Sequence, residues 1–545
     1  MASPATMLVL CLRTTTMSAV KIVVAESIAD AGLELLAAYA QVDLATEADH
    51  EELTRRLREA DALVVRSATQ VDARMIGASP KLRVIGRAGI GVDNIDLEAA
   101  TRAGVLVVNA PQANTVSAAE HTMALLLAQA RNIAQADAAL RNGSWDRKRF
   151  RGVEVHGKTL GIIGLGNIGT LVAKRAAAFG MRLIGYDPYV LPARASRVGV
   201  ELCADLAGLC AEADFITVHL PRTRETEGLI GADLFALMQD GVRIVNTSRG
   251  GIVDEEALAD AVRSGKVAGA ALDVYSSEPL RDSPLFELPQ VVLTPHLGAS
   301  TREAQDRAAT DVAEAVVAAL NGELVLSAVN VDLGQDISDE VRRFLAVAEH
   351  LGKVFVALAG GLPRVLTIRA EGRLGEYAIR PLRLGVLKGV LAGSSDAPVS
   401  YVNAPAMAAD RGVSVEEESS DEARGYQSVF RVSGVVAGRT ISVAGTVGRG
   451  PLIAGILGFA LELPLANHLL IIRNEDIPGM IGRVGTLLGE LDINIADMVL
   501  GRSQDHPGIA LMALSVDRSM SDAELDGLRA MEGVGEAVEV ELDLH

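Results

Sequence analysis

The chain has 545 residues, of which 49% are hydrophobic, and a formal net charge of −19 at pH 7. That length predicts several domains with sizeable cores, and the acidic balance argues against nucleic acid or an anionic membrane as a partner. Cys11, Cys203 and Cys210 show neither metal-ligand spacing nor a CxxC pair, which favours a reducing, cytoplasmic compartment and no bound metal.

Residues 1–18 are predicted to be a disordered extension. The apolar run Met7–Leu12 is too short to span a membrane, and Arg13 and three threonines follow it where a signal peptide would carry small residues. A cleaved signal peptide is the alternative interpretation.

Residues 19–118 alternate strand patterns with helix patterns, which predicts a parallel sheet covered by helices on both faces. The segment Arg66–Thr69 follows one predicted strand, and the glycine loop Arg87–Asn94, which contains Gly89, follows another. Ligands of open α/β sheets bind beyond the carboxyl ends of the strands, so both loops are candidate anion sites. Ordinary turns between strand and helix are the alternative.

A single long helix is predicted from Val116 to Leu140. The segment 141–151 that follows holds the only Trp and five basic residues of an acidic chain. It is either a solvated charged surface or an anion site for a phosphorylated substrate, which could reach a neighbouring subunit.

Residues 158–187 have the pattern of a dinucleotide-binding unit: a buried strand, a glycine turn, a helix and a second strand that ends in an acid. Gly164 permits the tight turn, Gly166 lets the backbone approach a pyrophosphate, and Gly169 lets the helix pack closely on the strand. Asp187 can accept hydrogen bonds from ribose hydroxyls and would repel a 2′-phosphate, so NAD is favoured over NADP. An unliganded glycine turn is the alternative.

Three candidate catalytic residues follow later strands of the same α/β pattern: Arg249, Glu278 and His296. Oxidation of a 2-hydroxy acid needs a base for the hydroxyl proton and a cation for the carboxylate. His296 suits the first role, with Glu278 as the carboxylate that raises its pKa, and Arg249 suits the second. The pattern predicts a dehydrogenase acting at the carboxyl edge of the sheet.

The C-terminal part contains two further predicted units. Residues 327–465 mix helix and strand patterns and carry no catalytic constellation. Residues 468–545 follow the order β, α, β, β, α, β, which is ferredoxin-like.

The motifs GLGNIG, NTSRGGIVDE, SSEP and TPHLGAST resemble the D-isomer-specific 2-hydroxyacid dehydrogenases, in their long form with a C-terminal ACT domain. The resemblance runs from Lys21 to the C-terminus. It implies two doubly wound Rossmann-like lobes, followed by an α+β intervening domain (327–465) and a ferredoxin-like ACT regulatory domain (468–545). The lobes would be a discontinuous substrate-binding domain (19–118 and 300–326) and an NAD-binding domain (119–299), with hinge closure over the cleft.

The resemblance also assigns residues. Arg249, Glu278 and His296 would form the catalytic set. Ile90 and Leu220 replace threonines that are common near the cofactor. Cofactor contacts would fall on Gly164, Gly166, Asn167, Ile168, Gly169, Asp187, Thr247, Asp273, His296 and Gly298, substrate contacts on Arg66, Ser67, Gly89, Asn114 and Arg249, and contacts with an L-serine effector on Asn474, Asp476 and Asn494.

Family members with such a tail oxidise D-3-phosphoglycerate to 3-phosphohydroxypyruvate with NAD, the first step of L-serine synthesis, as homo-oligomers, here expected to be tetramers. Three alternatives remain at this stage. The chain could be a reductase of the glyoxylate or hydroxypyruvate type, it could be an NAD-sensing corepressor-like binding protein, or its ACT domain could serve assembly alone.

Overall fold

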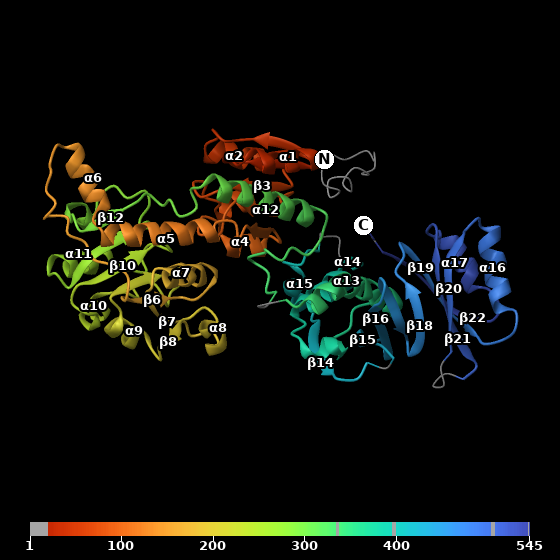
Figure 1. Cartoon of the computed structure of the whole chain (residues 1–545). Coiled ribbons are helices and arrows are strands. Elements are labelled where there is room, and N and C mark those ends of the chain that lie inside the picture. Colours follow the sequence, from red (N-terminus) through yellow and green to blue (C-terminus); the bar gives the residue numbers. More distant parts are fainter. Residues whose placement is uncertain are drawn as a thin grey trace, which may run out of the picture.

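The computed structural model describes residues 20–333, 337–394, 399–423, 425–502, 507–542 and 544. The extension expected at 1–18, with Cys11, lies outside these residues. Two α/β lobes occupy one end of an elongated molecule, and two further sheets occupy the other end (Figure 1). This arrangement agrees with the predicted fold class.

The first lobe is built on a five-stranded parallel sheet in the order β2-β1-β3-β4-β5. Helix α12 (Arg302–Leu320) returns from much later in the chain and packs on this sheet at Gly86, where a Cβ would lie 2.6 Å from Val316. Only glycine fits that contact. The other elements are β1 (Lys21–Val24), α1 (Asp30–Tyr39), β2 (Gln41–Leu44), α2 (His50–Leu57), β3 (Ala62–Val65), α3 (Ala73–Gly77), β4 (Val84–Arg87), α4 (Leu97–Arg102) and β5 (Leu106–Asn109).

The second lobe is a seven-stranded parallel sheet in the order β12-β11-β10-β9-β6-β7-β8. The predicted unit of strand, glycine turn, helix and strand is confirmed as β6 (Thr159–Ile163), α7 (Asn167–Ala178) and β7 (Arg182–Tyr186). The remaining elements are α8 (Pro192–Ser196), β8 (Glu201–Leu202), α9 (Leu206–Glu212), β9 (Phe215–Val218), α10 (Ala232–Leu237), β10 (Val242–Asn246), α11 (Glu255–Arg263), β11 (Val267–Leu272), η2 (Pro284–Glu287) and β12 (Val291–Leu293).

The prediction of one long helix over 116–140 is wrong. The chain forms α5 (Thr115–Ala130) and α6 (Ile133–Arg141), separated at Asn132, whose φ of 53° lies in the left-handed region. A left-handed residue interrupts the helical hydrogen bonds, and asparagine tolerates this conformation better than most residues. The carbonyl of Ala130 accepts a hydrogen bond from the amide of Val153 at 2.9 Å, so a later segment replaces the missing helical partner.

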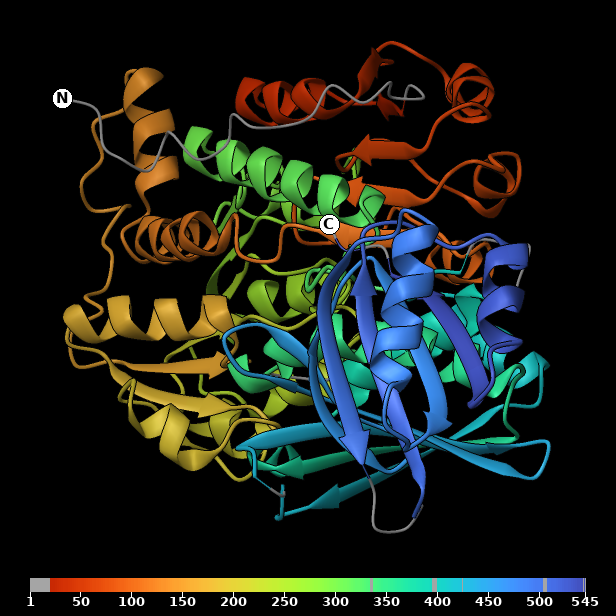
Figure 2. The same cartoon turned by 90° about the vertical axis from the view of Figure 1, so that its right-hand side faces the viewer.

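The C-terminal half contains a six-stranded mixed sheet (β14-β13-β15-β16-β17-β18) and a four-stranded antiparallel sheet (β20-β21-β19-β22). Seen from that end, α16 and α17 are outermost, with the antiparallel sheet behind them (Figure 2). The elements are α13 (Asp339–Ala359), β13 (Val365–Gly372), η3 (Arg373–Glu376), α14 (Arg380–Ala392), α15 (Ala404–Asp410), β14 (Ser414–Ser420), β15 (Ser428–Val436), β16 (Arg439–Val447), β17 (Pro451–Ile456), β18 (Phe459–Pro464), β19 (His468–Glu475), α16 (Met480–Glu490), β20 (Ile495–Arg502), β21 (Ile509–Val516), α17 (Asp522–Arg529) and β22 (Val534–Glu541).

The two C-terminal sheets share one hydrophobic core. Leu469 and Ile471 of β19 and Leu511 of β21 pack into the same cluster as Phe344 and Phe355 of α13. The opposite face of the antiparallel sheet forms a separate core with α16 and α17. The antiparallel sheet is therefore covered on both faces.

The C-terminal half is also anchored to the first lobe. Ala328, beyond α12, forms an antiparallel bridge with Val108 of β5, and Val402 is buried in the core of the first lobe. The hydroxyl of Ser400 donates to the carbonyl of Gly104 at 3.2 Å. Among the described residues, no helix is long and apolar enough to cross a membrane.

Candidate active site

A cavity of about 1250 Å³ lies between the two α/β lobes. Loops at the carboxyl ends of β3, β4 and β5 line one side, and loops after β10, β11 and β12 line the other. Sheets of this kind bind ligands at the carboxyl ends of their strands, so the cavity is where a ligand is expected. The predicted residues Arg66, Ser67, Gly89, Asn114, Arg249, Glu278 and His296 all line it.

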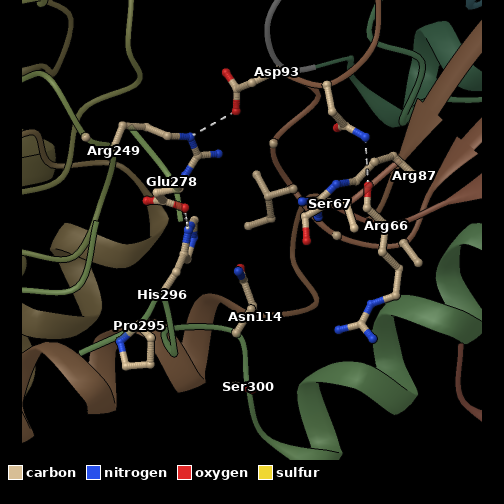
Figure 3. Close-up of a pocket in the computed structure, with 18 of the residues that line it drawn as sticks. Arg66, Ser67, Arg87, Asp93, Asn114, Arg249, Glu278, Pro295, His296 and Ser300 are labelled. Atoms are coloured by element: carbon tan, nitrogen blue, oxygen red, sulfur yellow. Dashed lines mark hydrogen bonds and ion pairs between the residues drawn. The ribbon is translucent and has the colours of Figure 1, made fainter. Parts of the chain in front are cut away.

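His296 and Glu278 form the central pair of the cavity (Figure 3). The Nδ1 atom of His296 lies 2.7 Å from Oε2 of Glu278, and Oε1 of Glu278 accepts the amide of Tyr275 at 3.0 Å. The hydrogen bond with Glu278 raises the pKa of His296 above its usual value. Burial raises the pKa of Glu278, but the bonds from His296 and Tyr275 outweigh it, so this pKa is lowered. The pair leaves Nε2 of His296 as the nitrogen available for proton transfer.

Arg249 reaches across the cleft from the loop after β10. Its Nε lies 3.3 Å from Oδ2 of Asp93 in the first lobe, as Figure 3 shows, and its Nη1 donates to the carbonyl of Ser248 at 2.8 Å. A Cβ on Gly91 would lie 2.4 Å from Nη2 of Arg249, so a larger residue there would displace the Arg249 side chain. The guanidinium is thus placed in the cavity, and among the described residues its one ion pair is with the exposed carboxylate of Asp93.

Asn114 projects into the cavity from the N-terminus of α5. Its Oδ1 is buried without a hydrogen-bond partner in the described structure. A buried polar atom that lacks a partner costs free energy, on the order of 1–3 kcal/mol, unless a ligand or water satisfies it. The position fits a substrate contact.

Arg87, at the end of β4, opens the glycine loop that was predicted as an anion site, but the sequence did not single it out as a site residue. Its side chain lines the cavity over Gly89, where a Cβ would overlap the guanidinium, and its Nε is buried without a partner in the described structure. Burial, together with the nearby charge of Arg249, lowers the pKa of Arg87 to about 10. An arginine directly after three buried apolar residues of a strand was the available signal.

The predicted nucleotide-binding residues gather at the carboxyl edge of the second sheet. A Cβ on Gly166 would meet nothing within 4 Å, whereas a Cβ on Gly169 would lie 2.1 Å from the carbonyl oxygen of Gly164. Gly166 therefore leaves open space before the amides of α7, and Gly169 permits close packing. The carboxylate of Asp187 accepts the amide of Leu165 at 2.8 Å, which places it beside the glycine turn. These residues fit a dinucleotide.

Asp273 and Thr247 are engaged by the protein itself. The Asp273 side chain has no exposed surface and accepts the amides of Leu297 and Gly298 at 2.7 and 2.8 Å. The hydroxyl of Thr247 lies 2.7 Å from that of Thr122. Both residues organise loops around the site. The other predicted cofactor residues, Asn167 and Ile168, open α7.

The basic segment 141–151 contributes no residue to the cavity of this chain. Trp145 within it is 80% exposed. Of the two interpretations, the structure of one chain fits the solvated surface, and an anion site there would need another chain. Within the described residues, no group of three or more His, Cys, Asp or Glu side chains could hold a metal ion.

The predicted effector residues lie in the antiparallel sheet, and the structure brings only two of them together. Asn474 of β19 is 3% exposed, and its Oδ1 lacks a hydrogen-bond partner in the described structure. Asp476 lies two residues further on, and its carboxylate accepts two hydrogen bonds from Arg502, at 2.7 and 3.0 Å. Strands β19 and β20 both run antiparallel to β21, so they point in the same direction. Asn474 lies at the end of β19 and Asn494 lies just before the start of β20, so the two residues are at opposite ends of the sheet.

Comparison with known proteins covers each part of the chain. Family models match residues 123–298 (D-isomer specific 2-hydroxyacid dehydrogenase, NAD binding domain), 340–451 (D-3-phosphoglycerate dehydrogenase intervening domain) and 468–533 (ACT domain). The D-3-phosphoglycerate dehydrogenase of Mycobacterium leprae is 48% identical over 90% of this chain and 93% of the relative. That of Synechocystis is 42% identical over 99% of this chain and 98% of the relative.

Solved structures match a little over half of the chain. A glyoxylate reductase from Paecilomyes thermophila superposes with a TM-score of 0.54 at 32% identity, covering 57% of this chain and 99% of that one. The D-lactate dehydrogenase of Escherichia coli gives a TM-score of 0.51 at 27% identity, covering 57% of this chain and 99% of that one.

The two lobes, the nucleotide fingerprint and the cleft between them define an NAD-dependent oxidoreductase. The chain belongs to the D-isomer specific 2-hydroxyacid dehydrogenase family, in the branch whose members carry the intervening and ACT domains of D-3-phosphoglycerate dehydrogenases.

Proposed function

We propose that this chain oxidises D-3-phosphoglycerate to 3-phosphohydroxypyruvate with NAD, which is the entry step of L-serine synthesis, in the cytoplasm. The observation that carries the proposal is the composition of the cavity. Four arginines and two carboxylates line it, and one of those carboxylates, Glu278, is committed to His296. Such an excess of cations fits a substrate with both a carboxylate and a phosphate.

The chemistry follows from the residues in the cavity. Arg249 binds the substrate carboxylate with its planar guanidinium. On binding, the substrate carboxylate replaces that of Asp93 as the ion-pair partner of Arg249. Neutral His296 accepts the hydroxyl proton at Nε2, and Glu278 stabilises the imidazolium that forms. NAD supplies the hydride acceptor when bound. Asp187 and the open turn at Gly166 hold the dinucleotide at the adjoining sheet edge.

Arg87 is our choice for the phosphate. Its charge is buried and lies close to that of Arg249, so their repulsion is relieved when an anion enters. Its Nε needs an acceptor, and phosphate oxygens provide one. Arg66 lies on the same side of the cavity, with Nη1 directed to the carbonyl of Ser27 at 3.3 Å, and supplies a second cation.

We further propose that L-serine is the effector and that the chain works as a homo-oligomer, with a tetramer as the expected state. Asn474 and Asp476 offer one end of an amino-acid site, and a second copy of the chain would supply Asn494. The exposed side chains of Ile477 and Ile481, 40% and 47% exposed, favour such pairing beside that end of the sheet.

The first experiment measures NADH formation from D-3-phosphoglycerate, D-glycerate and D-lactate, with the oxo-acid product trapped. We expect turnover only of the phosphorylated acid. Replacement of Arg87 by Met should lower kcat/KM for D-3-phosphoglycerate by about tenfold to 150-fold, since one hydrogen bond to a charged group contributes roughly 1.5–3 kcal/mol. The matched variant Arg74→Met, at an exposed arginine of α3, should behave as wild type.

Equal turnover of the unphosphorylated acids would reject the substrate assignment and favour a reductase of the glyoxylate type. That alternative rests on the solved glyoxylate reductase, whose match covers 57% of this chain. A chain without turnover that binds a partner only with NADH would favour the corepressor-like alternative. Serine is tested by titration of the wild type and of Asp476→Asn, in which the half-inhibitory concentration should rise at least about tenfold.

A further inference from the structure

Helix α5 runs between the two lobes (Figure 1), and its residues contact the loops after β10 and β12, which carry Arg249 and His296. Asn114 precedes its first turn and faces the cavity. Two turns later, His121 lies against the loop after β12, which carries His296. The next residue, Thr122, is fully buried and contacts Thr247, in the loop after β10 that carries Arg249.

The loop after β12 depends on the buried carboxylate of Asp273. Oδ1 accepts the hydroxyl of Thr294 at 2.6 Å and the amide of Leu297 at 2.7 Å, and Oδ2 accepts the amide of Gly298 at 2.8 Å. His296 sits between these contacts with a φ of 55°, which is left-handed and unfavourable for a histidine. Surrounding contacts must therefore hold His296 in place.

His121 completes this set of contacts. Its Nε2 lies 3.1 Å from Oδ1 of Asp273 and 3.2 Å from the hydroxyl oxygen of Thr294. The hydroxyl proton of Thr294 is already given to Asp273, so His121 is the donor to both oxygens. Burial raises the pKa of Asp273, but the bonds from His121 and Thr294 outweigh it and keep this carboxyl ionised.

We propose that His121 is a positioning residue for the proposed base His296, acting through Asp273 and Thr294. His121 does not line the cavity and so has no part in holding substrate. Its N–H bond fixes the Asp273 carboxylate, which in turn holds the Thr294 hydroxyl before His296 and the backbone amides of Leu297 and Gly298 after it. Because His121 belongs to the helix that joins the lobes, the orientation of His296 is tied to the placement of α5.

The test compares kcat and KM for D-3-phosphoglycerate in three variants. His121→Leu removes the donor, and we expect kcat to fall by about tenfold to 100-fold, with KM changed less than about threefold, because a hydrogen bond to a charged group is lost away from the substrate. His121→Gln places an amide N–H near the position of Nε2 and should recover kcat to within about threefold of wild type. His156→Leu, at an exposed histidine of the second lobe, is the matched control.

The inference rests on the proposed function, and wild-type turnover tests that function separately. Wild-type kcat in His121→Leu would overturn the inference, as would a His121→Gln variant that is as deficient as His121→Leu, or a change confined to KM. If His121→Leu does not fold, His121→Asn carries the test because its shorter amide cannot reach Oδ1 of Asp273. A tenfold or larger loss of kcat at unchanged KM supports the inference, and wild-type kcat in that variant rejects it.

Discussion

Replacement of Glu278 by Gln keeps the shape of the side chain and removes the charge beside His296. At the observed separation of 2.7 Å, two unit charges in water interact by about 1.5 kcal/mol. The side chains of His296 and Glu278 are 47% and 36% exposed, so solvent screening keeps the interaction near that value rather than the larger one of a dry interior. A charge-assisted hydrogen bond sets an upper value of about 3 kcal/mol. We therefore expect kcat to fall by about tenfold to 150-fold.

The same substitution has a directional effect on pH dependence. Glu278 raises the pKa of His296, so Gln at this position lowers it. Oxidation needs neutral His296, and its acid limb should move to lower pH. Reduction needs protonated His296, and its basic limb should move to lower pH as well.

Initial rates in both directions across the pH range measure these limbs. Glu287→Gln, at an exposed carboxylate of η2, provides the control. Limbs that stay in place, or that move to higher pH, would refute the assignment of Glu278 as the partner of a titrating His296.

Three further predictions concern binding and packing. Asp93→Asn removes the carboxylate that lies 3.3 Å from Arg249, so the substrate carboxylate no longer has to displace it. Initial rates should show a KM for the acid that is lower by about twofold to fivefold, as expected for an exposed ion pair. A higher KM would contradict the proposal that the substrate carboxylate replaces Asp93 on Arg249. Gly169→Ala places a Cβ 2.1 Å from the carbonyl of Gly164, so urea denaturation should report a loss of about 1–3 kcal/mol, and unchanged stability would mean that α7 shifts freely. Asp187→Ala removes the carboxylate that repels a 2′-phosphate, so the ratio of kcat/KM with NADP to kcat/KM with NAD should rise on the order of tenfold. Rates measured with both cofactors test this, and an unchanged ratio would mean that other residues determine the choice of cofactor.

The nucleotide unit could be predicted from the sequence because each of its glycines has a local mechanical role. The strand ends around Arg249, Glu278 and His296 could also be located, since parallel strands deliver their following loops to one sheet edge. That these loops meet the first lobe across one cavity follows from tertiary packing, which local patterns do not encode.

Other features lay beyond local patterns. Asn132 is acceptable within a helix pattern, and only the later segment that bonds Ala130 explains why the helix ends there. Arg87 resembles an ordinary strand-end residue until its burial over Gly89 is known. The shared core of the C-terminal sheets did leave a signal, since Ile509–Val516 is apolar on both faces, which indicates a strand covered on both sides.

The anchored C-terminal half is a long arm that extends from the first lobe. Val402 joins that half to the core of the first lobe, and the shared core joins the antiparallel sheet to the six-stranded sheet. We therefore expect the first lobe and both C-terminal sheets to move together in any closure of the cleft. The ACT helices lie at the far end of this arm (Figure 1), where a small rotation at the cleft becomes a large displacement. We expect a second copy of the chain bound at that end, as proposed above, to restrict the rotation of the two lobes.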